Sequence, residues 1–205
     1  MYLPKAFDHP ECASQIMRAH PLATLVHTGQ DGWPSATAVP LHWDAQGGPH
    51  GTLWGHFARA NPQGALLREQ PQALAIFQGP HAYMSPSVYP DKERVPTWSY
   101  VMVQARVRVT MVDEPEAKDA LLKRLIGDHE PAYAEQWKGL REAYTQDMLK
   151  RITAFQLVIE HIDVAVKLNQ HRPEAHAAMA EQLAQGGESE QALRGWMVKL
   201  GMIQP

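Results

Sequence analysis

The chain of 205 residues has one cysteine, Cys12, so it cannot form an internal disulfide bridge. It also lacks an apolar run of about 20 residues, the length that a membrane-spanning helix needs. The first twelve residues, MYLPKAFDHPEC, contain no hydrophobic signal segment. We therefore expect a soluble, cytoplasmic protein that makes no use of a membrane.

An excess of positive charge is absent as well. The 19 Lys and Arg residues face 22 Asp and Glu residues, and the net charge of −3 gives no general attraction to nucleic acid. The nearest match to a helix-turn-helix, residues 177–200, has three acidic and two basic side chains. Direct DNA binding is unsupported by the sequence, and recognition of an anion would have to be local.

The familiar catalytic and metal-binding signatures are missing too. The chain contains no G-x-S-x-G, G-x-G-x-x-G, Walker or H-E-x-x-H motif and no paired cysteines. None of the eleven histidines has the spacing of a metal ligand set, so no metal site is predicted. Without a partnered base, Cys12 is interpreted as a packing residue.

Periodicity predicts a fold made mainly of strands. The segment LATLVHTGQDGWPSATAVPLHWD has two β-rich runs around a Gln30–Gly32 turn, which predicts a hairpin with Pro40 at an edge or bulge. Further strands are predicted at 52–57, at 73–79 with its end at Gly79–Pro80, and at 101–111. In the run 153–168 the apolar positions change from odd to even near His161, which predicts a bulge or bend.

Helices are predicted between and after these strands. They cover residues 10–19, a segment from about residue 62, residues 114–127 with Gly127 as the stop, about 140–151, and two tail helices separated by Gly186–Gly187. Because alternating βαβ units are missing, we predict an α+β protein, mainly β with α insertions, built on an antiparallel barrel. The predicted domains are a barrel over 1–171, with inserted helices at about 114–151, and a helical extension over 172–205.

A possible anion site lies at residues 51–67, GTLWGHFARANPQGALL, where a predicted strand meets a predicted helix. Asn61 and Pro62 form a strong helix start, and His56 and Arg59 stand just before it. Free N–H groups at a helix N-terminus can hold a phosphate together with such side chains. The alternative is that Arg59 is a solvated cation, His56 a strand-end histidine and Asn61 only a cap.

Several segments resemble the PaiB family of FMN-binding proteins, which are described as negative transcriptional regulators. The resemblance runs from Met1 to about Pro173 and is carried by MYLPKAF, AHPLATLV, GHFARANPQ, ALAIFQGPHAYMSPSVYP, VPTWSY and KLNQHRP. It implies a split β-barrel of the pyridoxamine-phosphate-oxidase-like type that forms a homodimer, with FMN at the dimer interface. Val88, Ser99 and His171 depart from the family pattern, which has tryptophan at the first position and asparagine at the other two.

The resemblance also implies which residues bind FMN. Arg59 would be the main partner of the phosphate, assisted by His56 and Asn61, and Ser85 and Ser87 would offer hydroxyl and backbone groups. Nearer the flavin ring we expect Trp98 and Tyr100, although both could serve packing alone. Across the dimer, Lys167, Gln170 and Arg172 would complete the site; alternatively Lys167 is solvated and Arg172 pairs with Glu174.

Three functions remain open from the sequence: an FMN-binding regulator, a flavin-dependent oxidoreductase of unknown substrate, and an interaction module acting through the helical tail. No catalytic residue is assigned, because the flavin itself would carry any redox chemistry.

Overall fold

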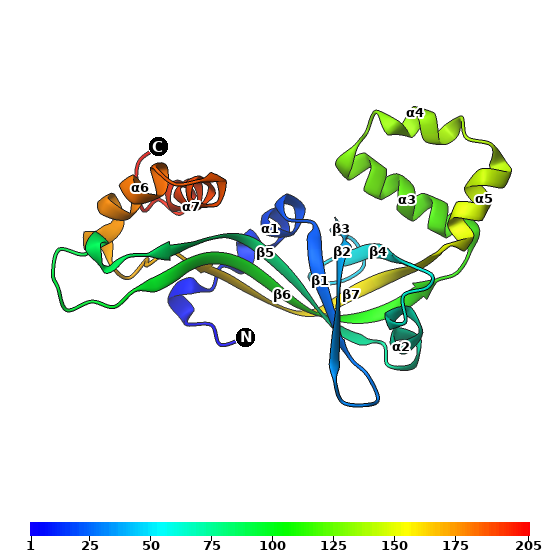
Figure 1. Ribbon diagram of the computed structural model, residues 1–205, viewed down its shortest axis with the longest axis horizontal. Coiled ribbons are helices and arrows are strands. Elements are labelled where there is room, and N and C mark those ends of the chain that lie inside the picture. Colours follow the sequence, from blue (N-terminus) through cyan, green and yellow to red (C-terminus); the bar gives the residue numbers. More distant parts are fainter. The chain divides into compact units, whose positions relative to one another are not determined.

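The computed structural model describes all 205 residues and contains one seven-stranded antiparallel sheet in the order β2-β1-β5-β6-β7-β4-β3 (Figure 1). The strands are β1 (Leu22–Thr28), β2 (Pro34–Pro40), β3 (His42–Asp44), β4 (Thr52–Ala58), β5 (Gln72–Met84), β6 (Thr97–Val112) and β7 (Ile152–Lys167). The helices are α1 (Ala13–Ala19), α2 (Gln63–Glu69), α3 (Pro115–His129), α4 (Tyr133–Lys138), α5 (Glu142–Lys150), α6 (His176–Ala184) and α7 (Glu188–Lys199). The predicted α+β fold with a mainly β framework is confirmed.

The chain divides into two compact units, each built from separate stretches of sequence. Unit 1 contains Met1–Ala19, Gln78–Val103 and Asp163–Pro205, and unit 2 contains His20–Phe77 and Gln104–Ile162. The long strands β5, β6 and β7 contribute residues to both units. The boundary predicted between residues 171 and 172 stays a prediction.

In unit 2 the predicted hairpin is confirmed. Strands β1 and β2 pair from Leu22↔Pro40 to Thr28↔Pro34, and Gly32 in the turn has φ +80°, a conformation that favours glycine. Strand β2 ends the strand order of the sheet, so the missing N–H of Pro40 removes no ladder bond toward a further strand.

The β4–β7 pair forms the other wall of unit 2, in register from Thr52↔Val158 to Ala58↔Ile152. The rings of Phe57 and Phe155 pack with centroids 4.7 Å apart. Beside them, a Cβ on Gly55 would lie 2.6 Å from Leu41 Cδ2 and 3.2 Å from Phe155 Cε2. Glycine therefore lets β4 approach these two side chains closely.

Helices α3, α4 and α5 form the insertion between β6 and β7 and lie together in Figure 1. Leu121 and Leu125 of α3 pack with Ala154 of β7, and Trp54 of β4 contacts the same cluster. The prediction that Gly127 stops this helix is wrong, since α3 continues to His129. A Cβ at Gly127 would meet no atom within 4 Å, so this glycine is an ordinary helical residue in open space.

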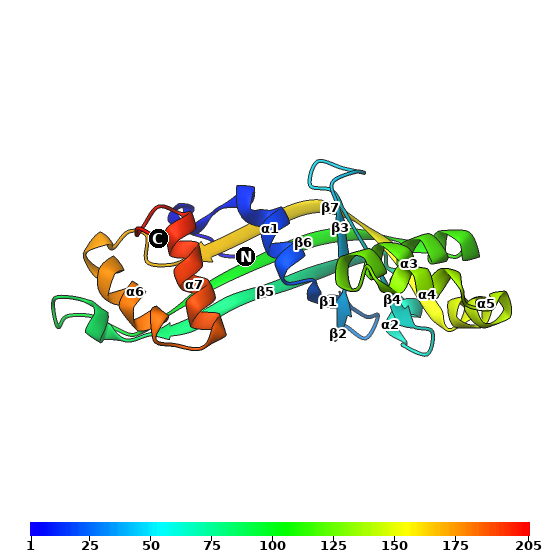
Figure 2. The same ribbon diagram turned by 90° about the horizontal axis from the view of Figure 1, so that it is seen from above.

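In unit 1 the predicted N-terminal and tail helices are confirmed as α1, α6 and α7. The N-terminal segment joins β7 through a bridge between Asp8 and Ala165, and the Met1 ammonium lies 2.7 Å from Asp163 Oδ2. Helices α6 and α7 lie against each other (Figure 2). Gly186 and Gly187 separate them, as predicted.

Two strand predictions need correction or extension. Strand β5 does not end at Gly79–Pro80 but continues to Met84. Its pairing with β1 spans only Leu74 to Ile76, so Pro80 lies beyond the stretch of β5 that pairs with β1. In β7 the buried positions change from odd to even around Glu160 and His161, as the sequence pattern indicated.

None of the helices combines the length and the apolar character needed to cross a bilayer.

Candidate functional site

A cavity of about 290 Å³ in unit 2 lies where β4 leads into α2. Its walls come from the β4–α2 connection, α2, the start of β7, the β6–α3 connection and α3. The lining residues are Arg59, Ala60, Asn61, Pro62, Gly64, Ala65, Arg68, Asp113, Lys118, Ile152 and Thr153. Three of these side chains are basic and one is acidic, which leaves a net charge of about +2 by simple count.

Arg59 is held beside this cavity by the C-terminal end of α5. Its backbone N–H donates to the Arg151 carbonyl at 2.7 Å, and its Nη1 donates to the Lys150 carbonyl at 3.3 Å. A guanidinium has five N–H donors, so this side-chain bond leaves others to face an anion. Lys118 Nζ, on α3, lies 3.5 Å from the Ile152 carbonyl oxygen and adds a second cation to the cavity.

Asn61 fixes the start of α2. Its Oδ1 accepts the Gln63 N–H at 2.9 Å, while its Nδ2 donates to Thr37 Oγ1 at 3.1 Å. The Gly64 N–H donates to the Asn61 carbonyl at 3.2 Å, and the Ala65 N–H to the Pro62 carbonyl at 3.1 Å. The expectation that this helix end supplies free N–H groups is therefore wrong: the first amides already have partners, and an anion must be held by side chains.

His56 is placed away from this cavity. It lies in β4 opposite Ala154 of β7. Its side chain is on the same face of the strand as that of Trp54, which packs against the α3 cluster. His56 does not line the cavity. Its Nδ1 is buried without a hydrogen-bond partner, and burial lowers the pKa of the imidazole. The structure thus brings Arg59 and Asn61 together at the cavity and separates His56 from them.

An aromatic cavity of about 490 Å³ lies in unit 1 on β5 and β6. It is lined by Gln78, His81, Trp98, Tyr100 and Met102. Trp98 is 53% exposed, and its ring centroid lies 6.3 Å from that of His81. The strand alternation of residues 98, 100 and 102 could have identified Met102, whereas Gln78 and His81 were not predicted.

Lys167 of β7 reaches one wall of the aromatic cavity. Its Nζ lies 5.6 Å from the Tyr100 ring centroid and donates to Thr97 Oγ1 at 2.8 Å. Burial lowers the pKa of the Lys167 ammonium. Three predicted residues, Trp98, Tyr100 and Lys167, are therefore neighbours in unit 1.

Ser85 and Ser87 form hydrogen bonds with each other in the segment after β5. Ser85 Oγ accepts the Ser87 N–H at 3.1 Å and the Ser87 hydroxyl at 2.8 Å, and so caps the short 3₁₀ helix Pro86–Val88. Neither serine lines either of the two cavities described above.

Gln170 closes the turn that follows β7. Its Oε1 accepts the Leu168 N–H at 2.9 Å, and its Nε2 donates to the Val166 carbonyl. Asn169, between Leu168 and Gln170, has φ +58°, a left-handed conformation that asparagine tolerates better than most residues. The buried Asn169 side chain donates to the Tyr89 hydroxyl at 2.9 Å.

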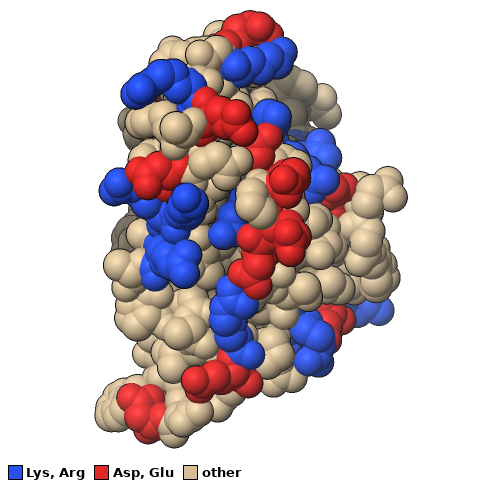
Figure 3. Space-filling view, turned by 90° about the vertical axis from the view of Figure 1, so that its right-hand side faces the viewer, with Lys and Arg blue, Asp and Glu red and all other residues tan.

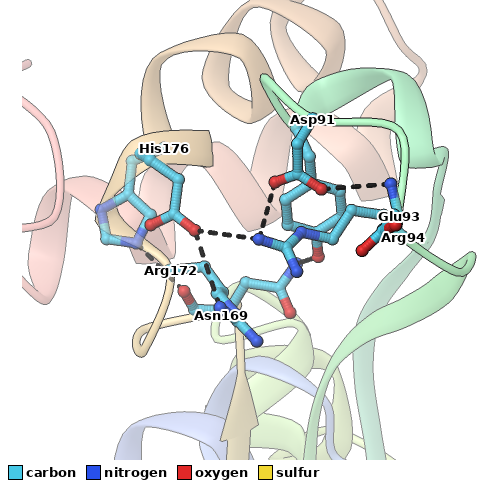
Figure 4. A network of polar contacts seen from close by, with 8 residues as sticks. Asp91, Glu93, Arg94, Asn169, Arg172 and His176 are labelled. Carbon is cyan, nitrogen blue, oxygen red and sulfur yellow. Dashed lines mark hydrogen bonds and ion pairs between the residues drawn. The ribbon is translucent and has the colours of Figure 1, made fainter.

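Arg172 belongs to a polar network between the loop after β5 and the tail (Figure 4). Its Nη1 lies 3.8 Å from Glu174 Oε1, the pairing considered as an alternative to flavin binding. The same carboxylate oxygen lies 3.9 Å from Arg94 Nη2, which pairs with Asp91 at 2.7 Å. Gln170 and Arg172 therefore both have structural partners within unit 1.

The comparisons with known proteins agree with this architecture. Residues 1–161 match the family model "Putative FMN-binding domain". The chain belongs to this family. It is 34% identical over 177 residues to "Protease synthase and sporulation protein PAI 2" of Bacillus subtilis (strain 168), which covers 85% of this chain and 84% of that protein. Membership of the PaiB family and FMN as the cofactor are thus confirmed.

Two solved structures with low sequence identity share the fold of this chain. The flavocytochrome Anf3 from Azotobacter vinelandii matches 78% of this chain and 67% of its own, with a TM-score of 0.62 and 15% identity. The FAD and heme binding protein from Mycobacterium smegmatis matches 78% and 72%, with a TM-score of 0.58 and 19% identity. The predicted split-barrel fold is confirmed.

The donor set of the unit 2 cavity fits the phosphate of FMN. A phosphomonoester carries a charge of about −1.5 to −2 near neutral pH and accepts several hydrogen bonds, and guanidinium groups bind it through charge-assisted bonds. The cavity offers two guanidinium groups and one ammonium.

Proposed function

We propose that this protein is an FMN-binding regulatory protein that holds the FMN phosphate in the cavity beside α2, with Arg59 as its main partner. The observation that carries the proposal is the convergence of Arg59, Arg68 and Lys118 on one cavity next to the Asn61 cap. FMN supplies redox chemistry when bound. The chain's own groups supply charge, orientation and the shape of the cavity.

The proposed regulatory role is supported by the name of the Bacillus subtilis relative, which is called a protease synthase and sporulation protein. Recognition of DNA bases by this chain has little support. The first turn of α7 contains Glu188 and Glu190, and on the face seen in Figure 3 basic and acidic side chains are intermingled. We therefore propose that regulation works through FMN and protein contacts rather than through direct DNA recognition.

The phosphate site is tested by replacing Arg59. In Arg59→Ala we expect the affinity for FMN to fall by about 10- to 150-fold, the equivalent of about 1.5–3 kcal/mol for a charged hydrogen bond. The affinity for riboflavin, which lacks the phosphate, should change less than about twofold. Arg108→Ala is the matched control, because Arg108 pairs with Glu160 elsewhere in unit 2. Equal losses for FMN and riboflavin in Arg59→Ala would remove Arg59 from the phosphate site.

The regulatory proposal is tested separately with the FMN-loaded protein. We expect no salt-dependent shift of promoter DNA and no turnover of reduced nicotinamide beyond the rate of free FMN. A strongly salt-dependent shift in the gel mobility of the DNA would instead support direct DNA binding. Turnover with a reduced nicotinamide would support the oxidoreductase.

A further inference from the structure

The unit 2 cavity proposed to hold the phosphate is also lined by a carboxylate side chain, that of Asp113. Asp113, in the connection between β6 and α3, receives two hydrogen bonds from Arg68 of α2: Nη1 lies 3.0 Å from Oδ2, and Nη2 donates to Oδ1. Both residues line the cavity. The Arg68 side chain is 47% exposed and the Asp113 side chain 60%. The carboxylate thus meets the guanidinium edge-on with two bonds, the arrangement in which a guanidinium also binds phosphate.

The cations that lower the pKa of Asp113 all belong to the proposed phosphate site. Hydrogen bonding from Arg68 is the first cause that holds the pKa of this carboxyl below its usual value, and the positive charges of Lys118 and Arg59 act in the same direction. Asp113 is therefore ionised at neutral pH, when FMN carries its phosphate charge.

The pair contributes little to folding, since ion pairs with this exposure have measured values of about 0–1 kcal/mol. A fixed carboxylate inside an anion-binding cavity does have a direct electrostatic consequence, because it repels the incoming phosphate and occupies one of the cations that would receive it.

We propose that Asp113 is an internal competitor for the phosphate, which occupies Arg68 and sets the affinity for FMN below the value that the three cations alone would give. The inference rests on the proposed phosphate site. It makes Asp113 an affinity-determining residue: FMN binds through Arg59 and Lys118, and Arg68 becomes available only when the carboxylate releases it. The cofactor is then held reversibly.

The test is the affinity of Asp113→Asn for FMN and for riboflavin, measured by flavin fluorescence at low and high salt. We expect FMN to bind about 3- to 10-fold more tightly at low salt, a gain that shrinks at about 1 M salt as charge is screened. Riboflavin affinity should be unchanged. Asp147→Asn is the control, because Asp147 forms an exposed ion pair with Arg151 and does not line the cavity.

A double variant identifies the cation involved. The Asp113→Asn gain in FMN affinity should be smaller when it is introduced into Arg68→Ala than when it is introduced into the unaltered protein, because only the repulsion by the carboxylate is then left to remove. An equal gain in the two backgrounds would overturn the competitor model, and so would an FMN affinity in Asp113→Asn equal to or weaker than that of the unaltered protein. Thermal unfolding of each variant checks that it is folded.

The outcome for Arg59→Ala separates this inference from the proposed site. If Arg59→Ala loses FMN selectively and Asp113→Asn gains nothing, the phosphate site stands and the competitor model fails. If neither variant changes FMN affinity relative to riboflavin, the phosphate lies elsewhere and both fail.

Discussion

Ser189 of α7 makes two hydrogen bonds to the backbone of a single residue of β5, His81. Its Oγ accepts the His81 N–H at 2.8 Å and donates to the His81 carbonyl at 2.7 Å. Gln182 of α6 continues the pattern, with its Nε2 donating to the Tyr83 carbonyl at 3.3 Å. Because β5 pairs with β1 only as far as Ile76, these side chains satisfy an edge that lacks a strand neighbour.

We expect Ser189→Ala to destabilise the protein by about 1–2 kcal/mol, since two hydrogen bonds to the β5 backbone are lost. The His81 amide should also exchange its hydrogen faster, as that N–H loses its acceptor. Urea unfolding and amide exchange measure the two effects. Ser189→Thr keeps the hydroxyl and should retain most of the protection. Unchanged exchange at His81 in the alanine variant would show that the hydroxyl does not protect this edge.

Gln63 anchors α2 from inside the protein. Its side chain is 2% exposed, and its Nε2 donates to the Leu25 carbonyl of β1 at 3.0 Å. Gln63→Leu should cost about 1–3 kcal/mol, because the buried carbonyl loses this donor. Gln136→Leu, on the exposed surface of α4, is the control and should stay within about 0.5 kcal/mol. Equal stability of the two variants in urea unfolding would contradict the anchoring role.

Stability should fall as the pH is lowered through the range below about 6.5, the usual pKa of histidine. Burial lowers the pKa of His56 in the folded state, so the unfolded chain binds more protons than the folded one between the two pKa values. His20 acts with the same sign for the same reason. His56→Phe should therefore lose less stability between pH 7.5 and 5.5 than the unaltered protein, by urea unfolding. His50→Gln, at an exposed position, should not; an identical pH dependence for His56→Phe would disprove the role of His56.

We predict a homodimer in which Lys167 of one protomer contributes to the FMN site of the other. Light scattering should give twice the protomer mass across a wide range of concentrations. In mixed dimers of an Arg59→Ala chain with a Lys167→Ala chain, a shared site leaves one FMN site intact and one doubly altered. Two equally weakened sites would show instead that Arg59 and Lys167 serve the same site from one chain.

The strands were predictable because their side-chain pattern is local. Alternation in β6 identifies Val101, Val103 and Val107 as buried, and all three are. The limits of elements were harder to predict, since they depend on neighbours far away in sequence. Strand β5 continues past Pro80, beyond the stretch that pairs with β1, and α3 continues past Gly127, where a Cβ would meet open space.

The candidate site divides in the same way. Asn61 was identifiable as a cap from two adjacent residues, and Arg59 from its position beside that cap. Lys118 and Asp113 reach the cavity only through the packing of the α3 connection against α2, which no local pattern reveals. His56 was grouped with Arg59 by proximity in sequence, although His56 lies within β4 and only Arg59, which follows the end of that strand, lines the cavity.

The pairing of β4 with β7 decides when the proposed phosphate cavity can form during synthesis. Part of the lining comes from the β4–α2 connection, including Arg59 and Asn61, and part comes from Ile152 and Thr153 of β7. The Thr52↔Val158 to Ala58↔Ile152 register therefore has to form before the walls meet. A ribosome-bound chain that ends at α5 has Arg59 but lacks Ile152 and Thr153, so the proposed phosphate site would be complete only after β7 has left the exit tunnel and closed this long-range contact.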